Sequence, residues 1–247
     1  MRTFIDKDLY LGSQLELIKL IVKNSNDKFK TAYYAINSDC MLKYWNDIEY
    51  RGIINKKDNI SYVDGMGVIY AQKILNIPVA KERIATTDLF PELMNYLNVH
   101  KNNLNIFLLG GEPDIAETVK RNFSEIYPNV NIVGTHHGYF NKDTDSKSII
   151  DIINSLDVNI LFVGFGNPLQ EKWVEKHYFS LEVNSIITCG GLFDYYANKV
   201  KRAPIIFQKT GFEWLFRLFQ EPRRLYKRYI YGNLNYVLKV LFMKLKS

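Results

Sequence analysis

The chain has 247 residues, of which 47% are hydrophobic and 23% are charged, the balance of a folded globular protein and not of a disordered or fibrous one. Its two cysteines lie far apart without a metal-ligand spacing, which excludes a disulfide scaffold and a cysteine-rich zinc module. The formal net charge is +6, yet residues 201–247 carry eleven Lys or Arg against two Glu, a net charge of +9, so residues 1–200 carry −3. This uneven charge predicts a polyanionic partner for the C-terminal segment alone.

Six short apolar runs alternate with helix-like stretches over the first 200 residues. The runs are rich in β-branched and aromatic residues and are bounded by Gly, Asn or Asp, which is typical of buried strands. The predicted strands are residues 31–37, 60–64, 104–110, 130–134, 158–164 and 185–190. The predicted helices are residues 39–50, 66–76, 88–98, 113–126 (with Pro113 in its first turn), 144–155 and 168–179. Regular alternation of this kind predicts an α/β fold with a mostly parallel sheet and helices on both faces.

The pattern changes near residue 204, after which no strand is expected. Helix-like pieces are predicted over 205–220, after Pro222 and over 233–246. In the last piece an apolar face offers a contact for the core, for a partner or for a second copy of the chain, so a homo-oligomer is one expected assembly. We therefore divide the chain into a core, residues 1–203, and a helical basic appendage, residues 204–247.

No segment predicts secretion or membrane insertion. The N-terminus lacks the apolar region of a signal peptide, and no run of about 18 apolar residues occurs. We therefore expect a cytoplasmic protein that is free to associate with a membrane surface.

Candidate functional residues lie where the predicted strands end, because open α/β sheets bind ligands at the carboxyl ends of their strands. Asp64 ends the second strand, although the short motif by itself favours a helix cap. The glycines of 109–113 and 163–168 fit either an anion site or an ordinary turn. Gln170 lies in the first turn of the next predicted helix, within reach of the sheet edge.

An ordered series of short motifs carries more information than any one of them. The later motifs read GGLFD (190–194), RAP (202–204), EWLFR (213–217) and EPRR (221–224). The earlier ones read DGMG (64–67), ER (82–83), DL (88–89), LLGG (108–111), GYF (138–140) and GFGNPLQEKW (164–173). In order and number this series resembles the WecG/TagA/CpsF family of glycosyltransferases, over roughly residues 30–228.

The resemblance implies a specific reaction. Members of the family have a Rossmann-like core and transfer a sugar, typically of the N-acetylmannosamine type, from a UDP-sugar with inversion. The acceptor is an undecaprenyl-diphosphate-linked saccharide at the cytoplasmic membrane face, in cell-surface polysaccharide or teichoic acid synthesis. UDP-glucose or another UDP-hexose is the alternative donor. A basic appendage that joins the active site and an anionic membrane implies a peripheral protein on the inner face of the cell membrane.

The resemblance also implies roles for particular residues. The implied catalytic residues are Asp64, Arg217 and Arg224. The implied substrate-binding residues are Asn37, Arg83, Gly110, Gly111, Tyr139, Gly166, Gln170, Asp194 and Arg228. Three positions depart from the family pattern, because Ala35 replaces Thr, Thr86 replaces Gly and Asn198 replaces Gly. We expect Asn198 to keep the backbone conformation, since Asn tolerates the left-handed region.

Sugar transfer from a nucleotide diphosphate requires a base for the acceptor hydroxyl and stabilisation of the departing diphosphate. Asp64 is the predicted base. Backbone N–H groups at Gly110 and Gly111 and the arginines of the appendage are predicted to neutralise the diphosphate. No D-x-D motif lies at a strand end, so we expect arginine in place of a metal ion, with no cofactor.

Two other functions compete with sugar transfer on the residues alone. The aromatic and basic appendage suits single-stranded nucleic acid almost as well as a membrane interface. The family resemblance favours the membrane, and we expect no nucleic-acid partner. A dinucleotide-dependent dehydrogenase is disfavoured because no complete G-x-G-x-x-G fingerprint is present.

Overall fold

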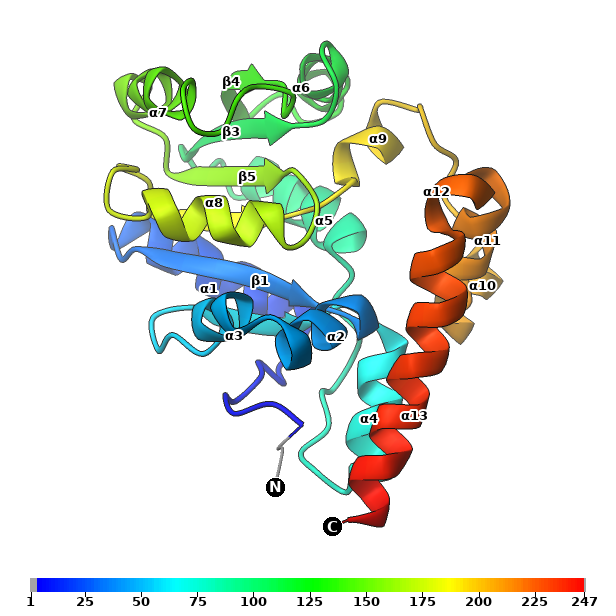
Figure 1. Cartoon of the computed structure of the whole chain (residues 1–247). Coiled ribbons are helices and arrows are strands. Elements are labelled where there is room, and N and C mark those ends of the chain that lie inside the picture. The colour runs from blue at the N-terminus through cyan, green and yellow to red at the C-terminus, as the bar shows by residue number, and fades with distance from the viewer. Residues whose placement is uncertain (1–3, 247) are drawn as a thin grey trace.

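The computed structural model describes residues 4–246, with the side chains at 208, 209 and 224 outside the described part. A six-stranded sheet with the order β2-β1-β6-β5-β3-β4 forms the centre (Figure 1). The strands are β1 (Thr31–Ile36), β2 (Ile60–Val63), β3 (Asn105–Gly110), β4 (Asn131–His136), β5 (Ile160–Gly164) and β6 (Ser185–Thr188). Every paired neighbour is parallel. The predicted Rossmann-like α/β fold and all six predicted strands are confirmed.

Helices cover both faces of the sheet. Those of the core are α1 (Gln14–Asn26), α2 (Ser38–Asn46), α3 (Ile48–Ile54), α4 (Met66–Leu75), α5 (Thr86–Val99), α6 (Ile115–Ile126), α7 (Ser146–Ser155), α8 (Leu169–His177) and α9 (Leu192–Tyr196). Side chains of β1 alternate between two buried clusters, with Tyr34 packing among α2, α3, α7 and α8 and Tyr33 among α1, α5 and α6. This alternation follows from the two-residue period of a strand.

The connections around β1 and β6 determine where a ligand can bind. β1 leads into α2, which packs on the first face, whereas its neighbour β6 leads into α9, which packs on the second face. The chain therefore leaves two adjacent strands in opposite directions. Such a point opens a crevice at the carboxyl ends of the strands.

Three local features of the core differ from the sequence-based expectations, and in the appendage the single helix-like piece expected over 205–220 is two helices separated at residues 211–212. Helix α1 was not predicted, although Ser13 and Glu16 form a reciprocal capping box at its start. The single helix expected over 39–50 is two helices, because Asp47 ends α2 and caps α3 by accepting a hydrogen bond from the Tyr50 N–H. Pro113 lies before α6, not in its first turn, since the cap residue Asp114 adopts a left-handed conformation.

The appendage docks against the core. It consists of α10 (Ile205–Thr210), α11 (Glu213–Gln220), α12 (Pro222–Tyr226), the π-helical turn η1 (Lys227–Tyr231) and α13 (Gly232–Leu245). Helix α13 lies along α2 and α4 (Figure 1). Its Tyr236 ring stacks on Trp45 at 5.6 Å between ring centroids, and its hydroxyl donates to the Gly67 carbonyl at 3.1 Å. Within residues 4–246, none of the helices has both the length and the hydropathy needed to cross a bilayer.

Candidate active site

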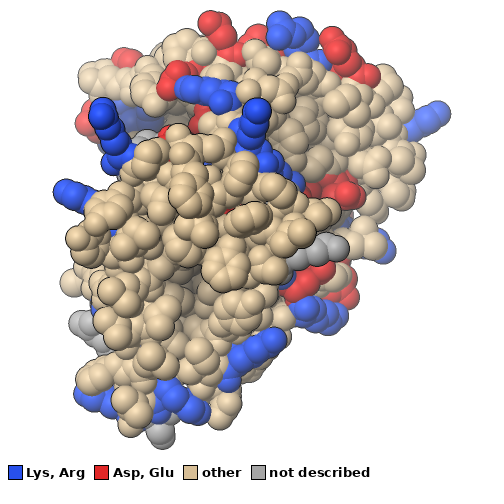
Figure 2. Space-filling model, turned by 90° about the vertical axis from the view of Figure 1, so that its right-hand side faces the viewer, with Lys and Arg blue, Asp and Glu red and all other residues tan. Residues whose placement is uncertain are grey.

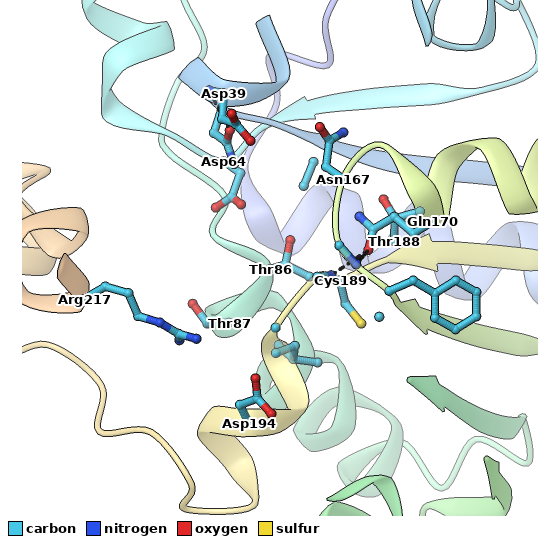
Figure 3. A pocket seen from close by; sticks show the side chains of 18 of the residues that line it. Asp39, Asp64, Thr86, Thr87, Asn167, Gln170, Thr188, Cys189, Asp194 and Arg217 are labelled. Carbon is cyan, nitrogen blue, oxygen red and sulfur yellow. Dashed lines mark hydrogen bonds between the residues drawn. The ribbon is translucent and has the colours of Figure 1, made fainter. Parts of the chain in front are cut away.

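A cleft with a volume of about 1380 Å³ lies between the carboxyl ends of the strands and the appendage (Figure 3). The loops after β1, β2, β5 and β6 form its floor, and α11 and η1 form the opposite wall. Pockets for drug-sized ligands commonly measure about 300–1,000 Å³, so the cleft has ample room for one. It brings together ten of the residues implied by the family resemblance: Asn37, Asp64, Arg83, Gly111, Tyr139, Gly166, Gln170, Asp194, Arg217 and Arg228.

Asp64 lines the cleft floor directly after β2. Its N–H extends the β1–β2 pairing by donating to the Ile36 carbonyl at 2.9 Å, and its carboxylate lies in the cleft (Figure 3). Burial raises the pKa of Asp64 to about 6, and the charge of Arg83 opposes this rise. A carboxylate with this pKa is mostly ionised at neutral pH, and because its pKa lies near the working pH it accepts a proton efficiently.

A network of four charged side chains joins the appendage to the floor beneath Asp64. Arg83 contacts Glu213 of α11 at 3.1 Å and Asp88 of α5 at 3.6 Å. Arg202 contacts the same two carboxylates at 3.6 Å and 2.6 Å, respectively. Both carboxylates raise the pKa of Asp64 further. Asp88 and Glu213 were not predicted as part of the site. Each belongs to a motif of the family, DL or EWLFR, but the spacing of the motifs along the sequence does not reveal that both residues contact Arg83.

Arg217 and Arg228 bring positive charge from the appendage. Arg217 is only 7% exposed, lies over the Tyr195 ring at 4.6 Å and contacts Glu221 at 2.9 Å. Its guanidinium extends from α11 into the cleft (Figure 3). Arg228 contacts Asp39 at 3.1 Å on the other side of the cleft. Because an arginine has five N–H donors, each guanidinium retains donors for an anion.

The other predicted site residues lie in different parts of the cleft. The Asn37 side chain caps α2 by accepting hydrogen bonds from the N–H groups of Asp39 and Cys40, both at 3.1 Å. Tyr139 is 69% exposed at the rim of the cleft, and Asp194 lies on α9 at the same rim. The side chain of Arg224 lies outside the described residues, so its predicted role stays a prediction.

The backbone at Gly110 and Gly111 does not present the pair of free N–H groups that the sequence predicts for a diphosphate. Gly110 pairs with Gly164 inside the sheet and does not line the cleft. The Gly111 N–H donates to the Gly164 carbonyl at 3.3 Å. A Cβ at Gly110 would lie 2.5 Å from that carbonyl, so this glycine permits two strand ends to approach closely. The α6 N-terminus lines a separate, smaller pocket.

Two of the three departures from the family pattern have clear structural outcomes. Asn198 has φ = 60°, which confirms the expected left-handed backbone. The Thr86 hydroxyl hydrogen-bonds the buried Tyr62 hydroxyl at 2.8 Å, so the added side chain has a partner in the wall of the cleft. Ala35 lines the cleft without a hydroxyl group.

The model of the glycosyl transferase WecG/TagA/CpsF family matches residues 5–247. The chain belongs to this family. The protein is therefore a glycosyltransferase of cell-surface polysaccharide synthesis, and membership sets aside the dehydrogenase and nucleic-acid-binding alternatives as its primary function.

In this glycosyltransferase the cationic and anionic side chains that line the cleft are carboxylates, guanidiniums and the ammonium groups of Lys142 and Lys199. Among the residues that the structure describes, no group of three or more His, Cys, Asp or Glu side chains is placed to hold a metal ion. In the D-x-D sequence at 143–145, Asp143 contacts Lys176 at 2.9 Å and Asp145 accepts hydrogen bonds within its own loop. Asp145 directly precedes α7, but its side chain caps no N–H group of that helix.

Proposed function

We propose that the protein transfers a sugar from a UDP-sugar to a hydroxyl group of a lipid-diphosphate-linked saccharide, with inversion at the anomeric carbon. One observation carries the proposal: a carboxylate with a pKa of about 6, Asp64, shares a single cleft with the largely buried guanidinium of Arg217. The first group suits a general base, and the second suits the charge of a departing diphosphate.

The proposed reaction is a single displacement. The acceptor oxygen bonds to the anomeric carbon while the bond from that carbon to the β-phosphate oxygen breaks. The electron pair leaves with UDP, and the hydroxyl proton passes to Asp64. Attack from the side opposite UDP inverts the anomeric configuration. Arg217, with Arg228 and Arg224, neutralises the additional negative charge on the diphosphate.

We propose an N-acetylmannosamine-type UDP-sugar as the donor, with UDP-glucose or another UDP-hexose as the alternative. The family resemblance supports the first. The changed cleft wall at Ala35 and Thr86 is the reason for testing the others.

We further propose that the appendage binds the anionic inner surface of the cell membrane. Figure 2 shows its outer face as largely uncharged, with Lys and Arg along the margins. The exposed apolar residues are Ile205, Ile206, Phe212, Phe219, Tyr226, Ile230, Tyr231, Leu234, Val237, Leu238, Leu241, Phe242 and Leu245. Apolar side chains bordered by cations suit a bilayer interface, where each basic residue contributes about 1 kcal/mol toward anionic lipid.

The deciding experiment measures UDP release and product mass with a panel of UDP-sugars and a short-chain lipid-diphosphate sugar. We expect turnover with one donor, an inverted product and loss of turnover in Asp64→Asn. Asp151→Asn, which changes an exposed carboxylate on α7 away from the cleft, is the matched control. The absence of UDP release with every donor would contradict the proposed reaction.

Vesicle flotation tests the membrane proposal separately. We expect binding to vesicles with anionic lipid, weaker binding to neutral ones, and loss of binding when Leu238 and Leu241 are both changed to Ser. Equal binding by this double variant would contradict the proposed orientation of the appendage.

A further inference from the structure

The amide oxygen of Gln170 joins two loops of the cleft floor. It accepts a hydrogen bond from the Gly166 N–H at 3.2 Å and another from the Gly190 N–H at 3.0 Å. These glycines follow β5 and β6, and both adopt positive φ angles, 83° and 55°. One side-chain oxygen therefore holds together the ends of two neighbouring strands (Figure 3).

The other end of the same amide determines its orientation. The Gln170 Nε2 donates to Glu171 Oε1 at 2.8 Å. Rotating the amide by half a turn would place its N–H groups against the N–H groups of Gly166 and Gly190, and its oxygen against Glu171 Oε1. The observed orientation therefore satisfies the glycine donors and Glu171 together, whereas the reverse satisfies neither.

Glu171 lies in an environment that disfavours a charge. It is 1% exposed, and its titratable neighbours include Tyr34, Tyr50 and Cys40. Burial raises the pKa of Glu171, and the hydrogen bond from Gln170 is the largest influence opposing that rise.

Cationic compensation for Glu171 is weak. Lys43 opposes the rise in pKa, but its Nζ contacts Asp39 at 2.6 Å. The hydrogen bond from Gln170 is therefore the main compensation for burying the Glu171 side chain.

We infer that Glu171 is a positioning residue that acts through Gln170: as an acceptor it fixes the Gln170 amide, and the amide holds the Gly166 and Gly190 loops in the shape that binds the sugar donor. The inference about the two loops concerns the unliganded protein. Its consequence for turnover rests on the proposed function.

The test compares an isosteric amide with an apolar side chain at residue 171. Glu171→Gln keeps an acceptor for Gln170, whereas Glu171→Leu keeps volume without it. In full-length protein without substrate, hydrogen exchange at the Gly166 and Gly190 amides should rise about tenfold in Glu171→Leu and return to near the wild-type rate in Glu171→Gln. Glu175→Leu, one turn along α8 at a residue that contacts Lys56, should leave both amides unchanged.

A double-variant cycle separates positioning from general packing. With the UDP-sugar, Glu171→Leu should lower kcat or raise the donor KM about tenfold, and Glu171→Gln should restore most of the loss. In a Gln170→Leu background, Glu171→Leu should change kcat or the donor KM by less than about twofold further, because the amide through which Glu171 acts is gone. If Glu171→Leu does not fold, Glu171→Asp replaces it, since the shorter acid should also lose the contact.

Two results would overturn the inference. One is that Glu171→Gln is as harmful as Glu171→Leu. The other is that the effects of the Gln170 and Glu171 substitutions on turnover are independent, so that the double variant shows their product. The expected exchange pattern in a protein without UDP-sugar turnover would refute the proposed function while leaving the loop-positioning role intact.

Discussion

Asp64→Asn is predicted to stabilise the protein while removing its activity. The pKa of Asp64 rises from 3.8 to about 6 in the folded state, chiefly through burial. Because one pKa unit corresponds to about 1.4 kcal/mol, ionising this carboxyl at pH 7 costs the folded state about 3 kcal/mol relative to the unfolded chain. The cost develops as pH rises from about 4 to 6, and it nearly vanishes below the unfolded-state pKa, where both states are protonated.

Urea unfolding at pH 7 and pH 4 measures this effect. An Asn side chain cannot ionise, so we expect Asp64→Asn to exceed the wild type in free energy of unfolding by about 3 kcal/mol at pH 7 and by less than about 1 kcal/mol at pH 4. In the UDP-release assay the same variant should lose about 10²- to 10⁴-fold in kcat, the usual contribution of a general base.

The control variant Asp151→Asn should leave kcat unchanged. It should also leave unchanged the difference between the free energies of unfolding at pH 7 and pH 4. Equal stabilisation of Asp64→Asn at both pH values would refute ionisation as its cause. Full turnover by that variant would refute the role of Asp64 as base.

Three further perturbations test the surroundings of Asp64. Arg217→Lys should lower kcat/KM for the donor about 10²-fold in UDP-release kinetics, because a lysine cannot bind two diphosphate oxygens with a planar fork; an unchanged value would contradict this role. Glu213→Gln removes a charge that raises the pKa of Asp64, so the acidic limb of the kcat/KM profile should move below pH 6; an unmoved limb would count against the coupling. Tyr236→Ala removes the stacking on Trp45 and should lower the free energy of unfolding by about 3 kcal/mol in urea titrations followed by tryptophan fluorescence, and a loss under 1 kcal/mol would disprove this anchoring.

Local sequence patterns were sufficient to predict the layers of the fold. Strand runs and helix periodicity depend on neighbouring residues, and all six strands appeared where this periodicity placed them. The same patterns placed Asp64 at the end of a strand and Gln170 in the first turn of a helix. Order along the chain, more than any one motif, identified the family that the full-length match then established.

Packing between distant segments decided what these residues can do. Arg83 and Glu213 lie 130 positions apart, and only the docked appendage brings them together. The turn sequence predicts that the Gly111 N–H is free for a phosphate, but the close approach of β5 gives this N–H a carbonyl partner. Desolvation and the charges of Arg83, Glu213 and Asp88 together determine the pKa of Asp64. These effects depend on distance and burial in three dimensions, so the sequence determined which groups are present and the tertiary structure determined their chemistry.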